Sequence, residues 1–113
     1  MSADSVEKIL GSPPKTTSNK QGFIAKEFDY DRLVVSFDED MSVAGIESHS
    51  PKYCFKQWLC PGISEAMVKS RMPGGKFVVA GKKGKLTIYD DSCWADITSS
   101  HGSIESVAIL CQP

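Results

Sequence analysis

The residues of this chain whose types could support chemistry are four cysteines and two histidines. The cysteines fall into two pairs, six and eighteen positions apart, and none forms the Cys-x-x-Cys spacing typical of zinc sites. A nucleophilic cysteine would need a base beside it in space, and no spacing here indicates one. We therefore predict no metal, no cofactor and no catalytic residue. The six residues are Cys54, Cys60, Cys93, Cys111, His49 and His101.

The redox state of these cysteines depends on the compartment. The first residues, Met-Ser-Ala-Asp-Ser-Val-Glu-Lys, lack the basic and apolar regions of a secretory signal. We expect an intracellular, cytoplasmic protein, in which reduced thiols are buried as small core residues. No apolar run approaches the roughly twenty residues of a membrane span, so we expect no membrane partner.

A group of carboxylates in the first half could supply oxygen ligands to Ca²⁺ or Mg²⁺. The central glycine and terminal glutamate of a calcium loop are missing from this stretch. We therefore interpret the group as a solvated acidic patch that contacts a partner. Its members are Asp29, Asp31, Asp38, Glu39 and Asp40.

The charges are sorted into blocks along the chain although the net charge is only −1. The local balance is −5 over 26–47, +7 over 52–85 and −4 from 86 to the end. Surfaces of opposite sign steer association and select partners. The pattern predicts that the folded protein presents one basic and one acidic face.

The basic block also contains aromatic residues, and it defines a second candidate surface. We expect its residues to contact another protein or a second copy of this chain, so that the protein is a small intracellular, non-catalytic binding domain. An alternative is single-stranded nucleic-acid binding, in which bases stack on aromatic side chains in a positive groove. The basic patch comprises Lys56, Trp58, Lys69, Arg71, Lys82, Lys83 and Lys85.

The elements that must position these residues begin with an N-terminal arm. A helix over 2–10 is indicated by a capping serine or aspartate and by an apolar face of Val6, Ile9 and Leu10. Gly11 ends it, and 12–22 has the Pro, Ser and Thr content of a polar linker. We expect an arm and linker over 1–22 and a compact domain over 23–113.

The compact domain is predicted to be rich in β-structure. Apolar side chains recur with period two, and the strongest pattern is a hairpin whose turn is Gly81-Lys82-Lys83-Gly84. Pro61 and Pro73-Gly74-Gly75 enclose one helical segment. The fold class is α+β, with six or seven short, mostly antiparallel strands in a half-open barrel or curved sheet. The expected strands are 23–28, 33–37, 76–80, 85–89, 94–98 and 104–111, and the helix is 63–72.

The segment Pro61-Gly62-Ile63-Ser64-Glu65-Ala66-Met67, followed by Gly74-Gly75-Lys76, resembles the helix of FKBP-type peptidyl-prolyl isomerases. In that family a glycine opens a short helix, which a turn closes before a strand. The family's pocket tryptophan is replaced by Ile63, and its Tyr-Gly loop does not follow Tyr89. The resemblance thus implies an FKBP-like fold without isomerase activity.

Overall fold

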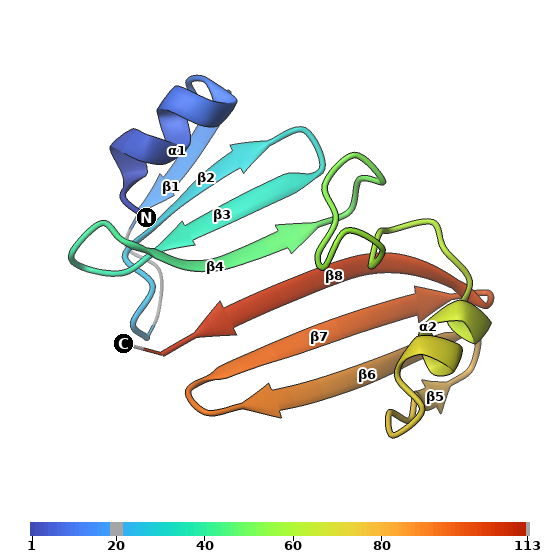
Figure 1. Ribbon diagram of the computed structural model, residues 1–113. Coiled ribbons are helices and arrows are strands. Elements are labelled where there is room, and N and C mark those ends of the chain that lie inside the picture. The colour runs from blue at the N-terminus through green and yellow to red at the C-terminus, as the bar shows by residue number, and fades with distance from the viewer. Residues whose placement is uncertain (19–21, 113) are drawn as a thin grey trace.

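The computed structural model describes residues 1–18 and 22–112 of the chain (Figure 1). Its strands form one open antiparallel sheet in the order β1-β2-β3-β4-β8-β7-β6-β5. In chain order the elements are α1 (Ala3–Leu10), β1 (Lys15–Ser18), β2 (Lys26–Tyr30), β3 (Leu33–Phe37), β4 (Val43–Ser48), α2 (Glu65–Arg71), β5 (Val78–Ala80), β6 (Lys83–Asp90), β7 (Cys93–Ser100) and β8 (Ser103–Cys111).

The described chain consists of two similar halves, each a helix followed by four strands. Strands β1 to β4 follow α1, strands β5 to β8 follow α2, and the last strands of the two halves pair at the centre of the sheet. In each half the residue before the helix bridges to the start of the last strand. Ser2 bridges to Ser42, and Ser64 bridges to Ser103.

The pairing of β4 with β8 relates the two halves by an approximate two-fold axis. Counting from Ser42 and Ser103, Ile46 corresponds to Val107 and Ser48 corresponds to Ile109. The two pairs Ile46↔Ile109 and Ser48↔Val107 therefore exchange under the symmetry. The axis passes between them, through the pair of Glu47 with Ala108.

Both helices cover the same face of the sheet. Residues paired across antiparallel strands project to one side, and the row Leu33, Ser48, Val107, Ile97 and Leu86 crosses five strands on the helical side. At one end of this row α1 contributes Ala3 and Val6 to a buried apolar cluster; at the other, α2 contributes Val68 to a second cluster. The opposite face, formed by the alternate residues of each strand, has no helix against it in the described chain.

Local sequence explains both helices. The side chain of Ser2 accepts a hydrogen bond from the Ser5 amide at 3.2 Å, and that of Ser64 accepts one from the Met67 amide at 3.1 Å. Such caps satisfy a backbone donor that the helix leaves free. Gly11, with φ +83°, ends α1 because only glycine adopts this conformation readily.

The β-rich class and the two helices are confirmed, but the expected strand number was wrong: the described residues form eight strands, not six or seven. The two additional strands are β1 and β4. Strand β1 lies within the segment expected to be a linker, where Lys15–Ser18 pairs with β2; positions 19–21 of that segment lie outside the described residues. Strand β4 has weak local signals because Gly45 interrupts its apolar pattern.

Candidate functional site

A cleft of about 500 Å³ lies on the helical face of the sheet. It lies between α1, strands β3 and β4, and the loop 49–63 that follows β4. Nearly all of its walls are apolar. They are formed by Met1, Val6, Ile9, Leu10, Leu33, Val35, Val43, Ile46, Lys52, Tyr53, Cys54 and Phe55.

The fully buried Ser48 attaches one wall of the cleft to the sheet. Its hydroxyl lies 2.8 Å from the carbonyl oxygen of Tyr53 and 3.1 Å from that of Ser50, and it accepts from the Ser50 amide at 3.3 Å. These contacts fold the chain back immediately after β4. Buried polar groups stabilise a fold when they are hydrogen-bonded in this way, so Ser48 fixes where Tyr53 lies.

A disulfide closes the next part of the same wall. Cys54 is bonded to Cys60, and within this loop the backbones of Phe55 and Leu59 exchange hydrogen bonds of 2.9 and 2.8 Å. Leu59 is buried in the cluster beneath α2, and Phe55, which packs against the same cluster, also lines the cleft beneath α1. The loop therefore adds a buried residue, Leu59, to the core of the second half. The cavity beside Leu59 has a volume of about 220 Å³, which is smaller than the cleft in the first half.

Lys52 brings a positive charge to the lining of the cleft. Lys52 is exposed, and its ammonium lies 5.6 Å from the centre of the Tyr53 ring. No acidic side chain among the described residues forms an ion pair with Lys52. The site thus combines apolar walls with a cation at its rim.

Tyr30 stands beside this region and ties the end of α1 to β2. Its hydroxyl donates to the carbonyl oxygen of Gly11 at 2.8 Å. Burial raises the pKa of this phenol, and the negative charge of Glu7 and the neighbouring Tyr53 raise it further. The hydroxyl therefore keeps its proton and acts as a donor at neutral pH.

The basic patch predicted from sequence is divided between the two faces of the sheet. On the helical side, Arg71 lies 5.1 Å from the Trp58 ring, and Lys69 pairs with Glu65 at 3.1 Å. Trp58 is half-buried and packs against the second core cluster. Lys56 and Lys82 are exposed in turns, Lys56 after the bridge residue Phe55 and Lys82 between β5 and β6.

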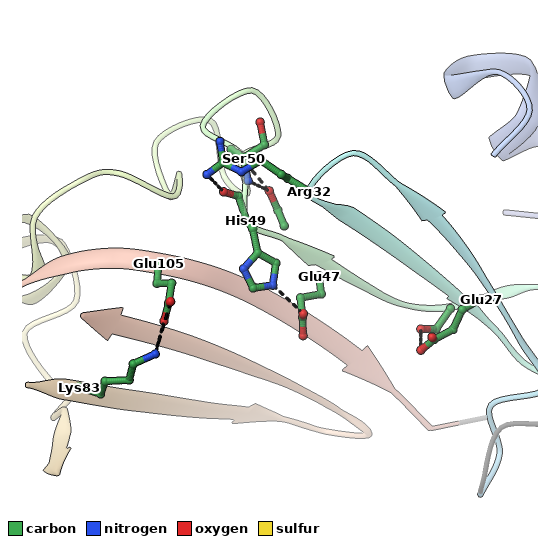
Figure 2. Close-up of polar contacts among 9 residues, drawn as sticks. Glu27, Arg32, Glu47, His49, Ser50, Lys83 and Glu105 are labelled. Carbon is green, nitrogen blue, oxygen red and sulfur yellow. Dashed lines mark hydrogen bonds and ion pairs between the residues drawn. The ribbon is translucent and has the colours of Figure 1, made fainter. Parts of the chain in front are cut away.

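The remaining two lysines of that patch are paired with acidic residues. Lys83 forms an ion pair with Glu105 (Figure 2), with 3.1 Å between nitrogen and oxygen, and Lys85 lies 3.6 Å from Asp96. Both acidic partners belong to the last block of the sequence, which was predicted to contribute to an acidic face. Opposite charges therefore meet within the sheet, between neighbouring strands for Lys85 and across the intervening strand β7 for Lys83. The charge blocks of the sequence do not form uniform faces here.

The acidic patch is divided as well. Asp31 lies in the turn before β3 and Asp38 in the turn after it, so the two ends of a five-residue strand separate them. Asp38 accepts hydrogen bonds from the amides of Asp40 and Ser42 at 3.0 and 3.1 Å, which is a structural role in that turn. Glu39 and Asp40 are exposed or half-exposed beside it, and Asp29 accepts from Thr17 at 3.3 Å.

The four cysteines and the two histidines make contacts within the fold. The expectation of four reduced thiols was wrong, because Cys93 is bonded to Cys111 as well as Cys54 to Cys60. His49 lies 2.8 Å from Glu47 (Figure 2). Among the described residues there is no group of three or more side chains that could hold a metal ion. No described helix has the length and apolar content to cross a membrane.

Comparison with known proteins reveals similarity of fold only. No family model matches the sequence, and no curated protein matches it. A solved extracellular protein containing an SCP domain, from Bacillus anthracis, is 11% identical with a TM-score of 0.74; the match covers 98% of this chain and 43% of that one. A DUF4309 family protein from Bacillus subtilis is 8% identical with a TM-score of 0.64, covering 98% and 78%. A cysteine-rich secretory protein from Staphylococcus aureus is 13% identical with a TM-score of 0.63, covering 96% and 43%.

These findings correct two expectations. The cytoplasmic location was wrong, since the protein forms two disulfides and similar solved structures are of extracellular proteins. The intracellular binding domain with segregated charged surfaces is contradicted by the same findings. Nucleic-acid binding, its alternative, stays a prediction. Ile63, the residue singled out by the isomerase resemblance, accepts a backbone hydrogen bond from Ile104 at 2.8 Å and packs against the second core cluster.

Only some of the residues that line the cleft were predicted from the sequence. The apolar face of Val6, Ile9 and Leu10 was predicted, and all three line the cavity. Tyr53 and Phe55 lie in the loop after β4, outside every expected strand. Only the tertiary hydrogen bonds of Ser48 bring that loop opposite α1.

Proposed function

We propose that this chain is a secreted, disulfide-stabilised domain that binds an amphipathic carboxylate, with an apolar tail in the cleft and the anionic head beside Lys52. The observation that carries the proposal is the cavity of about 500 Å³ with apolar walls. Small-molecule sites have volumes of roughly 300–1,000 Å³, apolar linings and few polar groups. Oxidised cysteines support an extracellular compartment, as do the extracellular proteins to which the fold is similar.

The head group follows from the charges at the rim. Lys52 is exposed and without an acidic partner among the described residues, so an anion can approach it. The walls beneath it offer only dispersion and burial, which favour a hydrocarbon chain. A long-chain carboxylate matches both features.

The test is calorimetric titration with dodecanoate, and with dodecanol as the uncharged analogue. Ile9 lines the cleft yet is 67% exposed, so Ile9→Glu should leave the fold intact and weaken dodecanoate binding at least tenfold. Met67→Glu is the matched control, because Met67 is an exposed apolar residue of α2 that does not line the cleft. Lys52→Glu should weaken dodecanoate and leave dodecanol unchanged.

Three results would contradict the proposal or part of it. Absence of heat or saturation with dodecanoate at millimolar concentration would exclude the ligand class. Equal binding to the native protein and to Ile9→Glu would place the ligand elsewhere. Equal effects of Lys52→Glu on acid and alcohol would refute the assignment of the head group.

A further inference from the structure

The outer edge of β6 is only partly covered by its neighbour. Strand β6 has eight residues and β5 has three, so the pairing ends where Val78 meets Lys85. From Leu86 onwards no strand of the described chain lies on that side of β6. An uncovered edge exposes a row of backbone donors and acceptors that can pair with another chain.

The register identifies which groups are exposed. Asp90 pairs with Cys93 across a two-residue turn, and such turns are closed by a hydrogen-bonded pair. Hydrogen-bonded and non-bonded pairs alternate along antiparallel strands. The N–H and C=O groups of Thr87 and Tyr89 therefore point away from β7, towards the free edge. Within the described chain no backbone hydrogen bond outside the sheet ladders reaches either residue.

A groove of about 470 Å³ runs along this edge. One wall is the segment after α2, from Met72 to Lys76, and the other is the stretch of β6 from Leu86 to Ile88. Gly75 approaches Leu86 so closely that an added Cβ would lie 3.0 Å from its methyl groups. The segment from Met72 to Lys76 runs beside β6 at Leu86 without pairing with it, and the groove lies between the two.

The side chains around the groove define what it could accept. Met72, Leu86 and Ile88 provide apolar surface within it, and Tyr89, the next residue of β6, is 77% exposed. The side chains of an added strand that share the face of Ile88 would point into this apolar surface.

The ends of the free edge differ in charge. Lys76 lines the groove near Leu86, and Asp91 lies in the turn beyond Tyr89. Both are exposed, and neither forms an ion pair within the described residues. A strand running antiparallel to β6 would place its amino end at Asp91 and its carboxyl end at Lys76.

We infer that the edge of β6 from Leu86 to Tyr89 binds an extended peptide by strand addition. The peptide runs antiparallel to β6, as the other strands of the sheet do beside their neighbours. It carries apolar residues at alternate positions, a basic residue towards its amino end and an acidic residue towards its carboxyl end. Strand addition derives affinity from backbone hydrogen bonds and specificity from alternate side chains.

Two peptides of the same composition test the inference: acetyl-Lys-Val-Thr-Val-Thr-Glu-amide and its reverse, acetyl-Glu-Thr-Val-Thr-Val-Lys-amide. We expect the first to bind at least tenfold more tightly in a titration followed by amide NMR shifts. The amide protons of Thr87 and Tyr89 should gain protection from exchange when it binds. Ile9→Glu, which alters the separate cleft on the helical face, should leave this binding unchanged.

The matched variants are Thr87→Pro and Thr87→Val. Proline removes the outward N–H, and an edge position with its N–H towards solvent tolerates proline; we expect at least a tenfold loss of peptide binding. Valine removes the side-chain hydrogen bond to Asp96, 2.8 Å long, but keeps the backbone donor, and its binding should change by less than about twofold.

Several outcomes would overturn the inference. Failure of both peptides to bind at millimolar concentration excludes an extended peptide at this edge. Equal binding of the two peptides refutes the antiparallel arrangement between Lys76 and Asp91. Dimerisation of the protein that Thr87→Pro abolishes would make a second copy the occupant instead. If Thr87→Pro unfolds the protein, exchange protection at Thr87 and Tyr89 in the native protein still decides the matter.

Discussion

Ser2 and Ser64 occupy the same position in the two halves of this protein. Each caps its helix through its hydroxyl and bridges to a serine that precedes or begins the last strand of its half. The backbone contacts are also equivalent: the amide of Ala3 donates to the carbonyl of Met41 at 3.0 Å, and that of Glu65 to the carbonyl of Gly102 at 2.8 Å. One small polar residue thus begins each helix and fixes it to the sheet.

Removing either cap should therefore destabilise the protein. We expect Ser2→Ala and Ser64→Ala each to lower the free energy of unfolding by about 1 kcal/mol, because a helix amide loses its partner. Urea denaturation measures this change. Ser70→Ala is the control, since Ser70 is exposed in α2 and should tolerate alanine without loss. A loss at Ser70 equal to that at Ser64 would show that the cap is not responsible.

Substitution of Gly45 should destabilise the protein because the neighbouring strand β8 lies close to its Cα atom. An added Cβ would lie 2.5 Å from Leu110 Cδ1 and 3.0 Å from the carbonyl oxygen of Ile109. We expect Gly45→Ala to cost about 1–3 kcal/mol in the free energy of unfolding, as overpacking does. Gly74→Ala, where nothing lies within 4 Å of the new atom, should be neutral or slightly stabilising. Equal thermal stability of the two variants would refute this account.

The two disulfides should contribute unequally to stability. In the loop-entropy model the Cys93–Cys111 bond, which spans 18 positions, contributes about 3 kcal/mol, and the Cys54–Cys60 bond, which spans 6, about 2 kcal/mol. We expect paired Cys→Ser variants to lose stability in that order in urea. Thiol titration of the unfolded native protein should find no free thiol in the described chain; detection of free thiols would contradict the pairing.

Stability should fall in acid partly through Glu65. Its pKa lies below the ordinary value because Ser99 donates to it at 2.9 Å and Lys69 lies 3.1 Å away. With the folded pKa below the unfolded one, the stabilisation is complete above the unfolded value and is lost as pH falls through the folded value.

The measurement is urea denaturation between pH 2 and pH 7. The native protein should be more stable than Glu65→Gln at neutral pH, and their free energies of unfolding should converge at the acidic end. Glu39→Gln, at an exposed turn, should follow the native profile throughout. A constant difference between the native protein and Glu65→Gln at every pH would exclude the carboxylate as the cause.

Local patterns were sufficient to predict much of this fold. The helix over 2–10, the strand over 33–37 and the hairpin turn near Gly81 depend on caps, alternation and turn residues within a few positions, and each forms where expected or within about three residues of it. The β-strand Lys15–Ser18 was not predicted because its residues are polar. It forms by pairing with β2, which no local pattern records.

The candidate sites were harder to predict, for the same reason. The Lys83–Glu105 pair joins residues 22 positions apart, so two charge blocks that look separate in sequence are in contact. The cleft depends on the contact of Ser48 with the loop at Tyr53, and on which half of the sheet receives Leu59. The partners predicted for the charged patches remain predictions.

By itself, the sequence determined the positions of turns, of helix caps and of segments in which apolar and polar residues alternate. These features depend on the conformational preferences of residues that are close in sequence. Only the tertiary structure decided which strands are adjacent, which cysteines pair and which charges cancel. Those outcomes depend on the registers of the strand pairs. Cys93 and Cys111 are paired residues of β7 and β8, Lys85 and Asp96 meet across β6 and β7, and the pairing of β4 with β8 aligns the two halves of the chain.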